Sequence, residues 1–385
     1  MIHIDKFIPG GQTLGTMPDG RKGFFWNALP SEDILEYDIT KKKSHYYEAV
    51  ATKISNPSQY RVLPLDNCYL STSPWQILDW NQENIEKSAL VVEIFREHHI
   101  DISVPPIVTD GNPYYYRNKM EYALYWNNVT SQIELAFHNR GSHRKVPITS
   151  SSIERPEIFQ KATEIIADLN SRHEEARKYQ SLLLRCGQSG EVSGGLYENG
   201  KSHPSFHVLT DTILGHTYSY SPNGFFQINL PVYELALKEI KAHITTDKVL
   251  DLYSGVGTIG LSVARDRHLT LVESNKSAYQ ESLSNIHGLQ NVKSILSKSE
   301  DVLDYIAPDT TVILDPPRAG CDIKLINKLL EVNPPVIIYL SCNPATQARD
   351  TKFLLEKYSI ISVQSFNFFP RTPHIENLVC LEKID

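Results

Sequence analysis

The sequence predicts an α/β protein whose C-terminal part is a doubly wound parallel sheet, preceded by a small β-barrel and a central α+β region. From about residue 221, apolar β-branched runs alternate with helical stretches, an order typical of a parallel sheet covered by helices. Short alternating runs separated by turn residues fill residues 1–62, as in a small barrel. Because 385 residues exceed one ordinary core, we expect domains at 1–62, 63–220 and 221–385.

The composition is that of an ordinary globular protein, with 41% hydrophobic and 22% charged residues. A net charge of −7 gives no general attraction to nucleic acid, so any such binding must come from local basic patches. The five cysteines are scattered without a CxxC pair, which argues against disulfides and cysteine-bound metals and suits a reducing cytoplasm. Neither a membrane-spanning apolar run nor a signal peptide is evident, so we expect a cytoplasmic protein without a membrane partner.

The first region carries basic residues beside aromatic ones. Strands are expected at Gly23–Trp26, Ile34–Ile39 and Tyr46–Ile54. Lys41, Lys42 and Lys43 precede Tyr46 and Tyr47, a combination that suits an oligonucleotide-binding barrel in which lysines hold phosphates and aromatics stack on bases. A solvated hairpin tip explains the same residues equally well.

The central region is expected to begin with a helix from Asp66 to about His99, on the spacing of its apolar residues. These residues are Ile77, Ile85, Ala89, Val92 and Phe95. Strands follow at Tyr114–Tyr125 and Ile133–His138. Aromatic and basic residues are interleaved here, which fits either an RNA-binding platform or a tyrosine-rich sheet core with solvated charges. They are Tyr114, Tyr115, Tyr116, Arg117, Lys119, Arg140, His143, Arg144 and Lys145.

The rest of the central region is predicted to be a helix, two strands and a loop. The expected elements are a helix at Ser150–Gln180, strands at Leu182–Arg185 and Val208–Leu214, and a loop at Gly187–Pro204. The C-terminal region then alternates helix and strand. Its expected elements are a helix at Pro231–Ile244, strands at Lys248–Tyr253, Leu269–Glu273, Val312–Asp315 and Val336–Ser341, and a terminal antiparallel hairpin of Ile361–Phe369 and Asn377–Lys383.

Cys342 directly follows a buried strand. Asn343-Pro344 turns the chain sharply after it, and a helix is expected over Ala345–Tyr358. Ligands bind at the carboxyl ends of strands in open α/β sheets, so a thiol there is placed for chemistry. A small buried hydrophobe that ends a strand is the alternative for this cysteine.

A glycine turn follows the first strand of the predicted sheet, within Asp251–Gly260. Glycines let the backbone approach a ligand, and Glu273 ends the next strand, where a carboxylate can accept hydrogen bonds from ribose hydroxyls. This pattern suits a nicotinamide dinucleotide as well as S-adenosylmethionine, or a turn without any nucleotide.

Asp315-Pro316-Pro317-Arg318 favours S-adenosylmethionine, because a nicotinamide enzyme has no use for a second motif of this kind. A carboxylate fixed at a strand end can hold a nucleobase through its N–H groups, although Asp315 can equally cap the following helix. Adenine amino methyltransferases use a similar turn with a stacking aromatic, where this sequence has Arg318.

Together these motifs resemble the RNA uracil-5-methyltransferase family, whose members methylate carbon 5 of uridine in tRNA or rRNA. The matching segments are Asn223–Asn229, Asp251–Gly260, Asp315–Gly320, Ser341–Pro344 and Pro373–Asn377. The resemblance implies a class I methyltransferase fold, a Rossmann-like doubly wound sheet with a terminal antiparallel hairpin, next to an RNA-binding barrel and central domain. It also implies S-adenosylmethionine as cofactor and tRNA or rRNA as partner.

By this resemblance, Cys342 is the nucleophile that attacks carbon 6 of the uracil, and Glu376 is the base that removes the proton from carbon 5. The cofactor and base pocket is implied to contain Gln227, Tyr253, Thr258, Glu273 and Asp315. Some family members carry an iron–sulfur cluster held by four cysteines. This sequence has only Cys68 in that region, with Leu70 and Ser73 where cysteines would be expected, so we predict no cluster and no metal site.

Two other functions remain open on the sequence. A cytosine-5-methyltransferase also needs a cysteine adduct at carbon 6, but such enzymes usually place the nucleophile after proline or threonine, and neither pair occurs here. A catalytically silent RNA-binding protein with a methyltransferase fold is the second alternative. It is disfavoured because each motif carries a residue of a reactive type.

Overall fold

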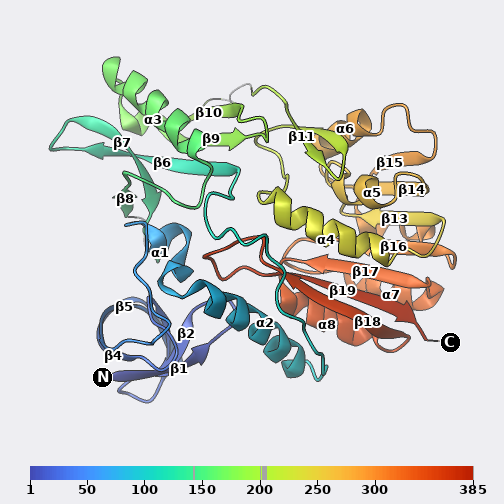
Figure 1. The fold of residues 1–385 in the computed structure, drawn as a ribbon, viewed down its shortest axis with the longest axis horizontal. Helices are drawn as coiled ribbons and strands as arrows, with labels where there is room; N and C mark the ends of the chain where they lie inside the picture. Colours follow the sequence, from blue (N-terminus) through green and yellow to red (C-terminus); the bar gives the residue numbers. More distant parts are fainter. Residues whose placement is uncertain (142–143, 200, 202–205, 385) are drawn as a thin grey trace.

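The computed structural model describes residues 1–141, 144–199, 201 and 206–384 (Figure 1). His143, one of the residues expected on an RNA-binding platform, lies outside the described residues. Figure 1 shows a barrel at the N-terminus, a central antiparallel sheet and a large C-terminal sheet, and a separate two-stranded sheet accompanies the last of these.

The first five strands close into a barrel in the order β1-β2-β3-β5-β4, which confirms the predicted small barrel. They are β1 (Ile2–Phe7), β2 (Thr13–Thr16), β3 (Lys22–Trp26), β4 (Asp33–Lys42) and β5 (Tyr46–Asn56). Tyr47 does not fit the interpretation in which the aromatics of this region stack on bases. Its side chain is buried in the barrel core, and the Arg21 guanidinium lies 4.1 Å from the centre of its ring.

The predicted helix from Asp66 to His99 is in fact three helical pieces. They are α1 (Tyr69–Thr72), the 3-10 helix η1 (Pro74–Ile77) and α2 (Trp80–Glu97). Ile85 is one of the apolar residues whose spacing predicted this helix, but it does not lie on the buried face of α2, because it is 59% exposed. The buried face instead carries Glu83 and Lys87 ahead of its apolar residues, and it can do so because these charges are paired.

The central sheet has the order β10-β9-β6-β7-β8 and packs against α3. Its elements are β6 (Lys119–Asn127), β7 (Gln132–His138), β8 (Lys145–Pro147), α3 (Pro156–Ser171), η2 (Ala176–Lys178), β9 (Tyr179–Cys186) and β10 (Val192–Glu198). The pairing of β6 with β7 confirms the predicted partner strands.

Three boundaries in the central region were wrong. The chain before Lys119 is irregular, with Tyr115 at a φ of 56°, so the predicted strand starts too early. Helix α3 is shorter than predicted at both ends. The predicted loop contains β10, whose Gly194 approaches β9 so closely that a Cβ would lie 2.1 Å from the Leu183 carbonyl oxygen. A glycine-containing strand lacks the apolar alternation that reveals a strand in sequence.

The C-terminal part begins with the hairpin β11 (Leu209–Ile213) and β12 (His216–Tyr220), then α4 (Leu230–Ala242). A seven-stranded sheet follows in the order β15-β14-β13-β16-β17-β19-β18. Its elements are β13 (Lys248–Leu252), α5 (Thr258–Val263), β14 (His268–Glu273), α6 (Lys276–Asn285), β15 (Val292–Leu296), η3 (Ser299–Asp301), η4 (Leu303–Tyr305), β16 (Thr310–Leu314), α7 (Ile323–Val332), β17 (Val336–Ser341), α8 (Pro344–Leu354), β18 (Tyr358–Phe366) and β19 (Glu376–Lys383).

Five strands of this sheet are parallel, and the terminal β18–β19 hairpin is antiparallel, which confirms the predicted doubly wound sheet and its hairpin. Helices α4 and α5 pack on one face, together with β11 and β12. Helices α7 and α8 pack on the other face, where α2 joins the same apolar core. The segment between β18 and β19 leaves the sheet and reaches toward α2 (Figure 1). Within the described ranges, the search for a helix of membrane-spanning length and apolarity finds none.

Candidate active site

The register of two strands brings Cys342 and Glu376 to the same edge of the sheet. Strand β19 runs antiparallel to β17, and the last residue of β17, Ser341, is paired with Asn377. The residue that follows β17 and the residue that begins β19 therefore lie side by side, at the carboxyl ends of the parallel strands. Residues far apart in the sequence meet where an open α/β sheet binds its ligands.

The turn that carries Cys342 is held mainly by its own neighbours. The Ser341 hydroxyl accepts a hydrogen bond from the Asn343 backbone N–H at 3.1 Å. The Asn343 side chain caps α8 by accepting from the Ala345 N–H at 3.3 Å, and it donates to the Arg318 carbonyl at 2.8 Å. These contacts fix the strand-to-helix turn and leave the cysteine partly exposed.

Cys342 lines a cavity of about 330 Å³ built from several parts of the chain. Gly10 comes from the barrel, Leu90 from α2 and Arg140 from the segment after β7. The mouth is completed by His374, next to the candidate base. A pocket of this size, closed by three regions around a thiol, suits one ring of a larger substrate.

The charged groups around the thiol interact. Burial, and then the negative charges of Glu376 and Asp315, raise the pKa of Cys342 to about 11, while Arg318 opposes this rise. Burial followed by the Asp315 charge raises the pKa of Glu376 well above its ordinary value. Burial raises the pKa of Asp315 to about 7. A buried carboxyl group with a high proton affinity suits a general base.

Arg318 and His374 were not predicted as site residues, yet they connect the two catalytic turns. An Arg318 Nη2 lies 2.9 Å from His374 Nδ1. Burial and the Arg318 charge lower the pKa of His374 to about 4, so the neutral ring accepts the hydrogen bond at Nδ1. The signal for this pair was in the sequence, since both residues lie inside motifs already singled out.

The glycine turn after β13 has the shape of a ligand cradle. Gly257 has a φ of 90°, and a Cβ there would lie 2.8 Å from Leu271 Cδ1, so the position requires glycine. Gly255 has a φ of 57°, and no described atom lies within 4 Å of the place a Cβ would take, so one side of the turn is open. The turn is anchored by Asp251, whose carboxylate accepts from the Gly260 N–H at 2.8 Å.

Glu273 and Tyr253 lie at the open side of this turn. The Glu273 carboxylate accepts from the Gly255 N–H at 2.8 Å through Oε2, and from the Asn275 N–H at 2.5 Å and the Ser274 hydroxyl at 3.5 Å through Oε1, so Oε2 keeps a lone pair for a hydroxyl. Tyr253, with a φ of 63°, lines a cavity of about 540 Å³ together with Glu300. Glu300 was not predicted, because the strand that precedes it, β15, was not predicted either.

Thr258 and Gln227 have structural partners. The Thr258 hydroxyl lies 3.0 Å from the Tyr233 hydroxyl on α4. Gln227 is buried in the segment before α4, and its carbonyl accepts from the Asn118 side chain at 3.0 Å. The structure therefore brings Tyr253, Glu273 and Asp315 to the strand ends, with Thr258 at the margin.

The segment Asn223–Asn229 is clamped by the central sheet. Lys119 Nζ donates to the Asn223 carbonyl at 3.1 Å, and Arg185 donates to the Phe226 carbonyl at 2.6 Å. Tyr116 is buried and donates to the Pro370 carbonyl at 3.0 Å. Lys119 and Tyr116, two residues of the expected RNA-binding platform, are therefore engaged, together with Arg185, in holding loops of the catalytic sheet.

The region of the missing cysteines is tightly packed. Cys68 is buried, and burial raises the pKa of its thiol to about 12. Gln76 donates to Asp66 and to Ser73, each at 2.7 Å. Among the residues that the structure describes, no group of three or more histidine, cysteine, aspartate or glutamate side chains is arranged to hold a metal ion.

Comparisons with known proteins identify relatives of this chain. The model of the tRNA (uracil-5-)-methyltransferase family matches residues 298–384. An uncharacterized RNA methyltransferase of Staphylococcus aureus is 30% identical, over 92% of this chain and 92% of its own length. One of Lactiplantibacillus plantarum is 29% identical, over 94% and 92%.

A solved structure has the same overall fold. It is the Pyrococcus abyssi tRNA (uracil-54, C5)-methyltransferase in complex with S-adenosyl-L-homocysteine. The structural match has a TM-score of 0.76 at 22% identity, over 99% of this chain and 100% of that one.

Proposed function

Because the chain belongs to the RNA uracil-5-methyltransferase family, we propose that it transfers a methyl group from S-adenosylmethionine to carbon 5 of a uridine in tRNA or rRNA, through a covalent Cys342 adduct. The observation that carries this proposal is the pairing of β17 with β19, which puts the cysteine beside Glu376. A nucleophile that must later be expelled needs a base at its side.

The cofactor would lie on the open side of the glycine turn. Glu273 Oε2 has a lone pair for a ribose hydroxyl, and the bare backbone at Gly255 permits close approach. Tyr253 lines the neighbouring cavity of about 540 Å³, and the family resemblance would add Gln227 and Thr258 to the cofactor and base pocket. When bound, S-adenosylmethionine supplies an electrophilic methyl group.

The Cys342 thiolate forms a bond to carbon 6 of the uracil, and the electron pair of the carbon 5–carbon 6 double bond moves onto the ring as an enolate. Carbon 5 is then nucleophilic enough to take the methyl group. Arg318 supports this step because its positive charge favours the thiolate against the neighbouring carboxylates. Asp315 would hold the ring by accepting from an N–H group.

Glu376 completes the reaction. Its carboxylate removes the proton from carbon 5, the electron pair re-forms the double bond, and the thiolate leaves carbon 6. Burial raises the proton affinity of this carboxylate, which suits the removal of a carbon-bound proton. The active site is thereby returned with a free thiolate and a protonated Glu376.

The RNA would present a base extruded from its stack, since a base stacked inside a helix cannot enter the cavity that Cys342 lines. Arg140 at the cavity and Lys41 and Lys42 on the barrel supply local positive charge for phosphates, despite the net charge of −7. We place the enzyme in the cytoplasm, where its thiol stays reduced.

The direct test is incubation of the protein with total RNA and labelled S-adenosylmethionine, followed by mass spectrometry of the modified nucleotides. We expect 5-methyluridine, and mapping its position identifies tRNA or rRNA as the substrate. Methylated adenosine would contradict the mechanism, and methylated cytosine would transfer it to the other pyrimidine.

The adduct is tested with RNA containing 5-fluorouridine, whose fluorine cannot be removed as a proton. The wild-type protein should become trapped on this RNA as a covalent complex that survives denaturing electrophoresis. The same complex in Cys342→Ala would remove Cys342 from the nucleophile role.

A further inference from the structure

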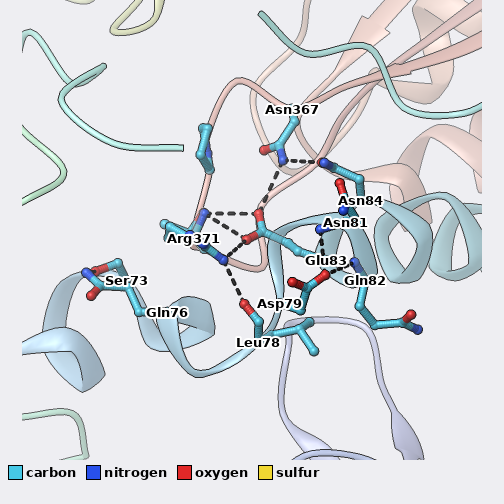
Figure 2. Close-up of polar contacts among 12 residues, drawn as sticks. Ser73, Gln76, Leu78, Asp79, Asn81, Gln82, Glu83, Asn84, Asn367 and Arg371 are labelled. Atoms are coloured by element: carbon cyan, nitrogen blue, oxygen red, sulfur yellow. Dashed lines mark hydrogen bonds and ion pairs between the residues drawn. The ribbon is translucent and has the colours of Figure 1, made fainter. Parts of the chain in front are cut away.

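A buried ion triad connects α2 to the segment that leads into Glu376. Figure 2 shows Glu83 of α2 at its centre, with Arg371 and Asn367 directed toward it. We propose that Glu83, Lys87 and Arg371 position the segment Asn367–Ile375 so that Glu376 can remove the proton from carbon 5. This inference rests on the proposed function.

Glu83 binds the segment at two of its turns. Its carboxylate accepts from the Arg371 backbone N–H at 3.0 Å and lies 3.5 Å from the Arg371 guanidinium. It also accepts from the Asn367 side chain at 3.2 Å. Because Glu83 is fully buried, these hydrogen bonds face little competition from water.

Lys87 holds the same segment from the next turn of the helix. Its ammonium group lies 2.9 Å from Glu83, donates to Asn367 at 2.7 Å and donates to the Phe369 carbonyl at 3.1 Å. Its side chain has no exposed surface. Each donor of this lysine is therefore directed at Glu83 or at the segment.

Arg371 adopts a conformation that few non-glycine residues take, with a φ of 63°. Its guanidinium donates to the Leu78 carbonyl at 2.7 Å, and its own carbonyl accepts from the Trp75 N–H at 3.0 Å. The guanidinium also lies 5.4 Å from the Trp80 ring centre, which offers a surface for positive charge. The strained backbone is thus held from three sides.

The support continues to the base. Thr372 accepts from the His374 N–H at 3.3 Å, and His374 binds Arg318. Pro373 packs against Gly11 of the barrel, where any Cβ would lie 2.0 Å from Pro373 Cβ. Glu376 then begins β19. No free loop separates the triad from the base along these described residues.

A buried ion pair is weak evidence for a role in stability, because apolar residues of similar size often serve as well. A role in positioning explains the triad better, since its donors and acceptors converge on the backbone and side chains of one segment. Cys342 lies on a turn with separate, local supports. Disturbing the triad should therefore impair the base more than the nucleophile.

The test uses Glu83→Gln, which keeps the size of the side chain and removes its charge, and Arg371→Lys, which keeps the charge and loses the guanidinium geometry. We expect kcat to fall by about 10- to 100-fold, as small displacements of a reacting group commonly cause, while the KM for RNA changes less than about twofold. The covalent complex with ordinary uridine RNA should accumulate, because it still forms but is resolved slowly.

Glu97→Gln, at the exposed end of the same helix, is the matched control and should behave as wild type. Unchanged kcat in both folded variants would overturn the proposal, as would a loss of adduct formation in proportion to turnover. If Glu83→Gln fails to fold, Arg371→Lys decides. Glu376→Gln is run in parallel: if it accumulates no adduct either, the proposed function fails, independently of the triad.

Discussion

The two catalytic turns lie side by side but are supported in opposite ways. The Cys342 turn is held by contacts near it in the sequence, the farthest described above joining Asn343 to Arg318, 25 residues away. The segment leading to Glu376 is held by α2, across 280 residues from Lys87 to Asn367, and by the residue after η1, across 293 residues from Leu78 to Arg371. The nucleophile is therefore built into the sheet, whereas the base depends on a distant helix.

Cys342→Ala should abolish methyl transfer, because no other thiol lies at the cavity among the described residues. Affinity for S-adenosylmethionine, measured by calorimetry, should stay within about twofold, since the turn is built by neighbouring residues. Residual turnover with label in uridine would show that the adduct is not required.

Glu376→Gln removes the carboxylate that we propose as the general base. Turnover should fall by about 10²- to 10⁴-fold, the range usual for loss of a general base, while the cysteine adduct still forms. Denaturing electrophoresis with ordinary uridine RNA should therefore reveal a covalent complex that the wild type does not accumulate. A variant that turns over normally would assign the proton transfer to another group.

Asp315 couples the two turns, because its charge raises the pKa of both Cys342 and Glu376. Its own pKa is about 7 in the folded protein and about 3.9 in an unfolded chain, so the unfolded state loses its proton first as pH rises. The stability that this group contributes is complete below pH 4 and is lost as the pH rises toward 7.

Asp315→Asn should therefore stabilise the protein at pH 8, on the order of 1–2 kcal/mol once partial exposure is allowed for, and have little effect near pH 4. Urea unfolding at the two pH values measures this difference. An equal effect at both values would mean that Asp315 does not titrate in this window.

Asn343→Ala removes the cap of α8 and the contact with the Arg318 carbonyl, so unfolding free energy should fall by about 1 kcal/mol. Asn343→Asp keeps the cap and is the control for urea unfolding. A cost well above this value would mean that the turn is supported from farther away than these contacts indicate.

The same difference explains what the sequence could predict. The doubly wound sheet, its terminal hairpin and the turn at Cys342 follow from local signals such as apolar runs, Asn-Pro and glycine turns. The burial of Glu83 and Lys87 was not predicted, because an i, i+4 charge pair normally lies on a solvent-facing surface. This pair is instead buried by a partner almost 300 residues away, and so the predicted inner face of α2 around Ile85 was wrong.

Lys119 was misjudged for a similar reason. Basic residues among aromatics are typical of an RNA surface, but Lys119, like Arg185, donates to a backbone carbonyl of the segment before α4. The folded arrangement of distant loops decides which backbone carbonyls need a side-chain donor, and no local sequence pattern identifies them. Long-range polar contacts of this kind are visible only in three dimensions.

The Gly11–Pro373 contact and the ion triad limit how this protein can be divided. A fragment starting near residue 221 would contain each strand of the catalytic sheet but would lack α2, and it would leave Arg371 without its carboxylate. A chimera that joins the N-terminal part of one homologue to the C-terminal part of another would take the two partners of each contact from different proteins. The catalytic sheet is therefore not a portable module, and exchange experiments should transfer α2 and the β18–β19 segment together.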